Sequence, residues 1–182
     1  MNDQVTFSKK DELRIQLLYE ELSDGWFHRN KDDEQKVRII CRNVSNVIHD
    51  CHSIWTGYIS AAAVDRLNYS NKPASEICAF DHFYGRMNSG ADVVSMFMDG
   101  PPDMQTYREE MYKHCKVHRV LKEENSRLRT YQNNRGMSWQ GAYYAAGIQL
   151  IKIDMGQKKN LTKQILKEHV FSQSVSLATV SC

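Results

Sequence analysis

The chain has 182 residues, of which 41% are hydrophobic and 25% charged, and its formal net charge is +2. These values are ordinary for a globular protein and exclude a collagen-like, coiled-coil or disordered chain. The charge balance also excludes a histone-like polycation, and the chain has no run of about 18 apolar residues that could form a transmembrane helix. The first residues, Met1–Gln4, lack the basic-then-apolar order of a signal peptide. We therefore expect a cytoplasmic protein without a membrane partner.

The first fifty residues favour two helices. In the first, Ser8 and Asp11 resemble a capping box, and Gly25 would end the helix. The second is expected over residues 32–50. The residues expected to face inward are Leu13, Leu17, Leu18 and Leu22 in the first helix and Val37, Ile40, Cys41, Val44, Val47 and Ile48 in the second. We interpret residues 1–52 as a helical segment that supports the rest or binds a partner, without chemistry of its own.

The remainder of the chain alternates short strands and helices. Strands are predicted where β-branched and aromatic residues gather, and helices where apolar residues recur at helical spacing. Strands are expected over 53–59, 76–80, 117–120 and 148–153, and helices over 61–67 after a Ser60 cap, 91–98, 104–114, 122–131, 139–146 and 161–171. This order predicts an α+β protein that is mostly helical, with a central domain at 53–153 and a C-terminal helix and tail at 154–182.

The most informative stretch is an apolar strand that ends in adjacent acidic and imidazole side chains, Asp81 and His82. A second strand and a helix that carries Asn125 follow it. Carboxylate and amide oxygens are hard ligands that suit a magnesium-like ion, and a neutral imidazole can take a proton from water. Together they point to a one-metal phosphodiesterase. The residues alone leave open that His82 is a structural histidine oriented by Asp81, and that Asn125 is a solvated helix residue.

Several neighbouring groups have more than one interpretation. Alternation along the strand at 117–120 places His118 and Arg119 on opposite faces, so only one of them is expected to face the site. The aromatic residues of the helix at 139–146 fit a core better than a base-stacking platform. Asn133 and Asn134 are an alternative source of the amide ligand, but their place beside Gly136 suits a turn better. Basic residues gather at 113–135 and at 152–167, where they either neutralise phosphates or form solvated faces.

Metal binding through cysteine is weakly supported. The five cysteines are scattered and include no C-x-x-C pair, which argues against a zinc ribbon or a disulfide framework. His114, Cys115 and His118 form an H-C-x-x-H cluster. Without a second cysteine pair, this cluster does not predict a zinc site.

Three strings of the central domain carry a resemblance to a known family. They are D-H-F-Y-G-R at 81–86, H-R-V-L-K-E-E-N-S-R-L at 118–128 and W-Q-G-A-Y-Y-A-A-G-I at 139–148. Over residues 53–153 the chain resembles the His-Me finger (HNH) nuclease superfamily, in particular the small DNA endonucleases encoded by tailed bacteriophages. The chain departs from that family in lacking bracing cysteine pairs and in having Leu121 at an expected helix-cap position.

The resemblance implies a central ββα-metal motif with a helical insertion at 89–115. In that motif, His82 is the general base that activates water. Asp81 and Asn125 hold one divalent ion, for which Mg²⁺ is the first candidate. The basic residues near them in sequence, which would contact phosphates of the nucleic acid, are Arg86, Arg119 and Lys122.

The function expected from these observations is that of a divalent-metal-dependent DNA endonuclease, which cuts or nicks double-stranded DNA in the cytoplasm of a host cell. The alternative is a non-catalytic DNA- or protein-binding module on a decayed nuclease fold. A ribonuclease is a third interpretation, because the same water-activating site can cut either polymer. The sequence leaves open whether the chain acts as a monomer or a homodimer.

Overall fold

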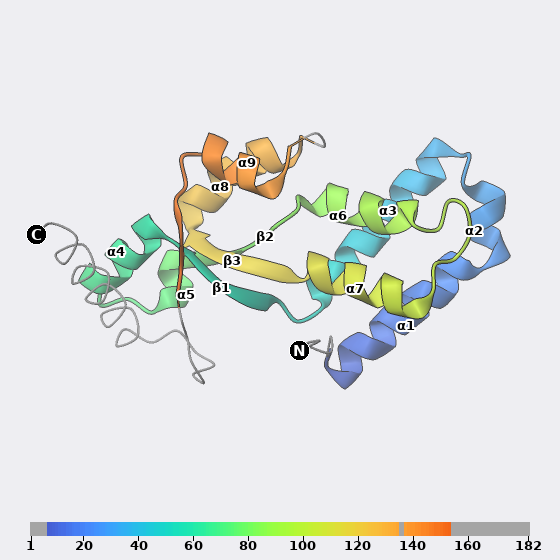
Figure 1. The fold of residues 1–182 in the computed structure, drawn as a ribbon, viewed down its shortest axis with the longest axis horizontal. Helices are drawn as coiled ribbons and strands as arrows, with labels where there is room; N and C mark the ends of the chain where they lie inside the picture. The colour runs from blue at the N-terminus through green and yellow to red at the C-terminus, as the bar shows by residue number, and fades with distance from the viewer. Residues whose placement is uncertain (1–6, 135–136, 154–182) are drawn as a thin grey trace, which may run out of the picture. The chain divides into compact units, whose positions relative to one another are not determined.

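The computed structural model describes residues 7–134 and 137–153, apart from the side chains of Arg86 and Met87 (Figure 1). The described helices are α1 (Lys9–Ser23), α2 (Gly25–Asn30), α3 (Glu34–Asp50), α4 (Ala61–Tyr69), α5 (Ala74–Ile77), α6 (Arg86–Ser95), α7 (Met104–His114), α8 (Lys122–Gln132) and α9 (Trp139–Ala145). The strands are β1 (Ile54–Ser60), β2 (Cys78–His82), β3 (Lys116–Leu121) and β4 (Leu150–Lys152). This confirms the predicted mostly helical α+β class. The tail helix expected at 161–171, like the segment 154–182, lies outside the described residues.

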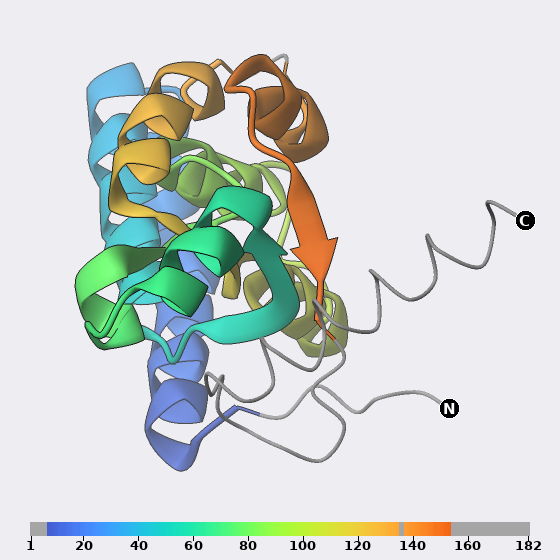
Figure 2. The same cartoon turned by 90° about the vertical axis from the view of Figure 1, so that its left-hand side faces the viewer.

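The strands form a four-stranded sheet of order β2-β3-β1-β4. Figure 2 shows β4 as the orange arrow beside β1, with which it pairs antiparallel, Ile59 opposite Ile151. The chain divides into two compact units that do not follow chain order. The first comprises the described parts of Met1–Ile54, His82–Val117 and Gln132–Trp139, and the second those of Trp55–Asp81, His118–Tyr131 and Gln140–Cys182.

The helix α1 begins where its capping residue predicts, but Gly25 begins the short helix α2 rather than ending α1. The Ser8 side chain accepts the Asp11 N–H at the start of α1. The buried stripe of α1 differs from the predicted one, because Leu13 and Leu17 are more than half exposed. The predicted burial of Leu18 and Leu22 is confirmed, and the third apolar residue of the buried face is Ile15. At 100° per residue these three positions lie on one side of the helix, and residues 13 and 17 lie on the other.

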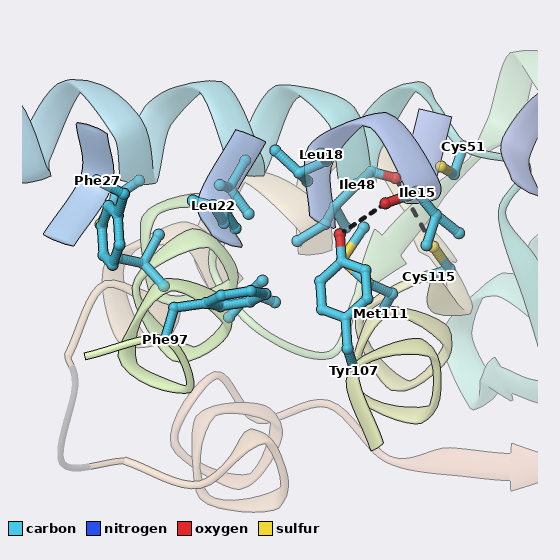
Figure 3. Close-up of a cluster of buried hydrophobic side chains, with 14 residues drawn as sticks. Ile15, Leu18, Leu22, Phe27, Ile48, Cys51, Phe97, Tyr107, Met111 and Cys115 are labelled. Carbon is cyan, nitrogen blue, oxygen red and sulfur yellow. Dashed lines mark hydrogen bonds between the residues drawn. The ribbon is translucent and has the colours of Figure 1, made fainter. Parts of the chain in front are cut away.

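The helices of the first unit enclose one hydrophobic core (Figure 3). The buried Tyr107 of α7 reaches α1, where its hydroxyl donates to the Ile15 carbonyl at 3.2 Å. The Cys115 thiol approaches the Ile48 carbonyl of α3 at 3.8 Å. Side chains from α1, α3, α6 and α7 therefore share this core, so the N-terminal helices pack together with the segment that the sequence predicts as an insertion.

A close approach between α3 and α6 explains why Gly90 does not start a helix. The sequence predicts a helix after Gly90, but α6 begins at Arg86 and contains the glycine in its interior. A Cβ atom at position 90 would lie 1.9 Å from the Cys41 carbonyl oxygen and 2.3 Å from the Ser45 Oγ of α3. Figure 1 shows the two helices side by side. Glycine is therefore required here by packing, which outweighs its low helix propensity.

In the second unit, the strand predicted at 76–80 begins later than expected. Pro73 opens the short helix α5, in which the Glu76 N–H donates to the Pro73 carbonyl at 3.0 Å. The strand β2 then starts at Cys78 and extends through His82. Asp81 and His82 are the last two residues of this strand. The core of this unit comprises Ile59, Ala63, Val64, Leu67, Ile77, Cys78, Leu121 and Ile153.

A buried hydroxyl and carboxylate join the starts of α4 and α8. Ser60 caps α4 by accepting the Ala63 N–H at 3.1 Å, and its hydroxyl donates to the Glu124 Oε2 at 2.5 Å. The same Oε2 accepts the Leu121 N–H at 2.8 Å. Glu124 thus supplies half of a capping box to α8, which explains how this helix begins without a Ser or Thr at position 121.

We expect Ser60→Ala to lower the free energy of unfolding by about 1 kcal/mol or more, because it removes the α4 cap and one donor to a buried carboxylate. Urea unfolding of both proteins measures this difference. Ser126→Ala is the matched control: its exposed hydroxyl donates to the Lys122 carbonyl within α8. The control is expected to change stability by less than about 0.5 kcal/mol. Equal effects of the two substitutions would contradict the assigned role of Ser60.

Candidate functional site

The residues of interest lie along the succession β2, β3 and α8. Asp81 and His82 are the last two residues of β2, and β3 is the neighbouring strand in the sheet. The helix α8 begins at Lys122, directly after β3, so Asn125 is its fourth residue. The predicted strand at 117–120 and helix at 122–131 are confirmed within one residue at each end. Asp81 and Asn125 belong to the second unit, and His82 is the first residue of a segment of the first unit.

Asp81 is held by an aromatic hydroxyl from a distant part of the chain. Its exposed fraction is only 4%. The Tyr143 hydroxyl of α9 donates to the Asp81 Oδ2 at 2.5 Å. Burial, and then the Asp81 charge, raise the pKa of Tyr143 far above its usual range. Tyr143 therefore stays protonated, and its hydrogen bond orients the carboxylate.

His118 of β3 lies against the same tyrosine. Its ring is fully buried and meets Tyr143 edge to face, with 5.2 Å between ring centroids, and Tyr58 at 5.4 Å. Burial lowers the pKa of His118 to about 4. The imidazole is therefore neutral near pH 7. Because His118 and Asp81 both contact Tyr143, the His118 face of β3 is the Asp81 face of the sheet.

Arg119 lies on the opposite face of the sheet. Its guanidinium carbon is 4.9 Å from the Phe80 ring centroid and 5.4 Å from that of Trp55. Phe80 precedes Asp81 in β2, and successive strand residues point to opposite faces. Burial also lowers the pKa of Arg119. The sequence left open which of the two residues faces the site. In the structure, His118 lies on the Asp81 face of the sheet and Arg119 does not.

The surroundings of His82 come from the N-terminal helices. Its imidazole lies against that of His49, in the last turn of α3, with 4.1 Å between ring centroids. The Gln132 side chain donates to the His82 carbonyl at 3.0 Å, which fixes the end of β2 against the end of α8. The sequence did not predict this pair of histidines, because it joins residues 33 positions apart whose approach depends on tertiary packing.

The other predicted residues have more open surroundings. Asn125 is half-buried and Lys122 is exposed, and their spacing of three residues places them on one side of α8. The Arg86 side chain lies outside the described part of the chain. Trp139 stacks on Phe83 with 4.8 Å between ring centroids, while Tyr144 is 88% exposed. Of the three aromatics of α9, only Tyr143 is fully buried in its unit.

The three side chains of the H-C-x-x-H cluster have separate surroundings. Cys115 belongs to the core of the first unit, and His118 contacts the two tyrosines of the second. The His114 ring meets Tyr84 edge to face, and its Nε2 lies 3.0 Å from the Glu110 Oε1.

The chain was compared with family models, curated proteins and solved structures, and none of them matches. Among the described residues, no helix is both long enough and apolar enough to span a bilayer.

Proposed function

We propose that the protein is a divalent-metal-dependent DNA endonuclease in which His82 is the general base and Asp81 and Asn125 hold one metal ion, Mg²⁺ being the first candidate. The observation that supports this most is the succession β2–β3–α8. It puts a carboxylate and an imidazole at the end of one strand, pairs that strand with the next, and starts the Asn125 helix directly after it. Apart from α6 and α7, which are inserted between the two strands, this order of elements is the one expected of a ββα-metal motif.

Each residue has a defined task in the proposed reaction. His82 accepts a proton from a water molecule as the water oxygen bonds to the phosphorus atom. The bond from phosphorus to the 3′ oxygen breaks, and that oxygen takes a proton from solvent. A divalent ion held by Asp81 and Asn125 would supply stabilisation of the negative charge that develops on the leaving oxygen. Tyr143 keeps the Asp81 carboxylate in a fixed orientation through its 2.5 Å hydrogen bond. The carboxylate is then preorganised for the ion before substrate binds.

His49 is a positioning residue for the proposed base. We expect His49→Ala to lower the initial rate of plasmid cleavage by about 10- to 100-fold, because the His82 ring loses the ring packed against it and small misplacements of a base are costly. His49→Phe, which keeps a ring, is expected to recover most of the rate if packing is the main contribution. Initial rates with supercoiled plasmid measure both. A fully active and folded His49→Ala protein would exclude this role.

The substrate contacts are proposed for the exposed side of α8. Lys122 lies three residues before Asn125, and Arg129 lies four residues after it; both are exposed. Such side chains can contact phosphates on either side of a bound ion. Arg86 remains a predicted contact. Arg119 is a weaker candidate, because its guanidinium lies on the sheet face opposite Asp81. Comparing cleavage of double-stranded DNA with that of RNA of the same sequence tests the polymer.

The alternative function, a non-catalytic DNA- or protein-binding module, is favoured by one observation. Asp81 is almost completely buried and hydrogen-bonded, which also suits a purely structural carboxylate. Incubating supercoiled plasmid with the protein in Mg²⁺ and in EDTA separates the two functions. Relaxed or linear product only in Mg²⁺ supports the nuclease, and the product form distinguishes nicking from double-strand cleavage. Retardation of the plasmid without cleavage in either condition supports the binding module.

A further inference from the structure

A second group of potential metal ligands lies within the first unit. Asp92 of α6 and Glu110 and His114 of α7 offer ligand atoms that all lie within 4.8 Å of one another, and the described residues contain no other such group of three His, Cys, Asp or Glu side chains. The His114 Nε2 is 3.0 Å from the Glu110 Oε1 and 3.8 Å from the Asp92 Oδ2. Glu110 and His114 share one face of α7 through their spacing of four residues.

The burial of His114 points to a ligand at this group. Its side chain is completely buried. Neither ring nitrogen makes a hydrogen bond of acceptable geometry, although Nε2 is close to the Glu110 carboxylate. A buried polar group in this condition needs an explanation, and a bound ion is one of the standard ones. The Nε2 atom has one carboxylate oxygen at 3.0 Å and another at 3.8 Å, so a cation bound among these three groups would lie within reach of this nitrogen.

The charges of the group also suit a cation. Glu110 and Asp92 each bring a carboxylate to the group, and that of Asp92 is half-exposed. The Lys113 Nζ lies 2.8 Å from the Glu110 Oε1 and 5.1 Å from the centroid of the Tyr84 ring. Lys113 thus competes with a metal ion for Glu110, but a single ammonium does not satisfy the His114 nitrogen.

We propose that Asp92, Glu110 and His114 bind a divalent first-row transition metal, with Zn²⁺ as the ion to test. One imidazole and two carboxylates are a ligand set that Zn²⁺ accepts, and a water molecule would complete a tetrahedral site on the exposed Asp92 side. Because the ligands come from two helices, the ion would fix α6 to α7. The inference does not depend on the nuclease proposal, whose ion would have oxygen ligands from Asp81 and Asn125.

Zinc binding to the metal-stripped full-length chain tests the proposal by titration calorimetry, with Co²⁺ absorbance reporting the ligand type. Asp92→Asn is expected to weaken zinc binding by at least about tenfold, because removing even a group that only hydrogen-bonds to a metal ligand commonly lowers the metal affinity by that factor. Asp92 is half-exposed, so this substitution spares the fold. Glu109→Gln, an exposed neighbour on α7, is the matched control and should bind as wild type. Asp81→Asn should also leave this affinity unchanged.

Lys113→Met provides a second, independent variant. It keeps an apolar side chain beside Tyr84 and removes the ammonium that competes for Glu110, so zinc should bind more tightly than to the wild type. A group that serves only as an ion-pair network predicts no such gain. The proposal is overturned if the wild-type chain shows no saturable zinc binding, or if the Asp92→Asn and Lys113→Met proteins both bind with wild-type affinity. A strong sulfur-to-metal charge-transfer band in the Co²⁺ spectrum would assign the ion to cysteine instead.

Discussion

His82→Ala is expected to lower the initial rate of plasmid cleavage by about 10²–10⁴-fold, which is the usual cost of removing a positioned general base. The water molecule would then have to lose its proton to solvent while it attacks the phosphorus atom. The metal ion and its ligands would remain, so binding of DNA should change little. The substitution therefore separates catalysis from binding, which most changes near a metal ion do not.

The measurement is the loss of supercoiled plasmid with time in Mg²⁺, with a parallel retardation assay in EDTA. His52→Ala is the matched control, because His52 is an exposed histidine of the same unit. We expect wild-type rates from the control, and intact DNA binding without cleavage from His82→Ala. Cleavage at the wild-type rate by a folded His82→Ala protein would remove His82 from the mechanism. Cleavage by the wild type in EDTA would contradict a metal-dependent reaction.

Elements with strong local signals were predicted well from the sequence. The helix at 104–114 has the predicted bounds, and its N-cap is Asp103, which accepts the Thr106 N–H at 3.0 Å. The helix at 139–146 ends as predicted at Gly147, which has a φ of 66°. The left-handed conformation at this position is available to glycine at little cost. In these cases the residues that determine the element lie within it or beside it.

The errors arise where distant residues decide the structure. Gly90 looks like a helix breaker in sequence, yet it permits the close approach of α6 to α3. The apolar residues Leu13 and Leu17 were assigned to the buried face of α1, but the core is formed from the opposite side. Neither the sequence spacing nor the composition specifies which of two apolar stripes meets another helix.

The candidate site was predicted only in part for the same reason. Asp81 and His82 are adjacent in sequence, so the chain brings their backbones together, although as successive residues of β2 their side chains start on opposite faces of the strand. The contacts of Tyr143 with Asp81 and of His49 with His82 join residues 62 and 33 positions apart. An aromatic at helical spacing and a histidine in an amphipathic helix are common in cores. No local pattern therefore distinguishes Tyr143 or His49 from an ordinary packing residue.

We expect the stability of the folded chain to depend strongly on pH, because His118 is buried. Its pKa is about 4 in the folded chain, against 6.5 for an ordinary solvated histidine, which is the value expected of the unfolded chain. Between these values the unfolded chain binds the proton and the folded chain does not, so acid favours unfolding. The stability that depends on a neutral His118 is complete above pH 6.5 and is lost progressively as the pH falls. From pH 7.5 to pH 5 the loss is about 2 kcal/mol.

Replacing His118 by Phe should remove this dependence, because the ring contacts with Tyr58 and Tyr143 are kept while the titrating group is lost. Urea unfolding at pH 7.5 and pH 5 measures how much the free energy of unfolding of each protein changes. The contributions of carboxylates that titrate in both proteins cancel when the two changes are compared. The free energy of unfolding of the wild type is expected to fall by about 2 kcal/mol more than that of His118→Phe over this pH interval. An equal loss in the two proteins would mean that His118 is accessible to protons in the folded chain. His118 would then be charged rather than neutral on the Asp81 face of the sheet, where it would compete with a metal ion.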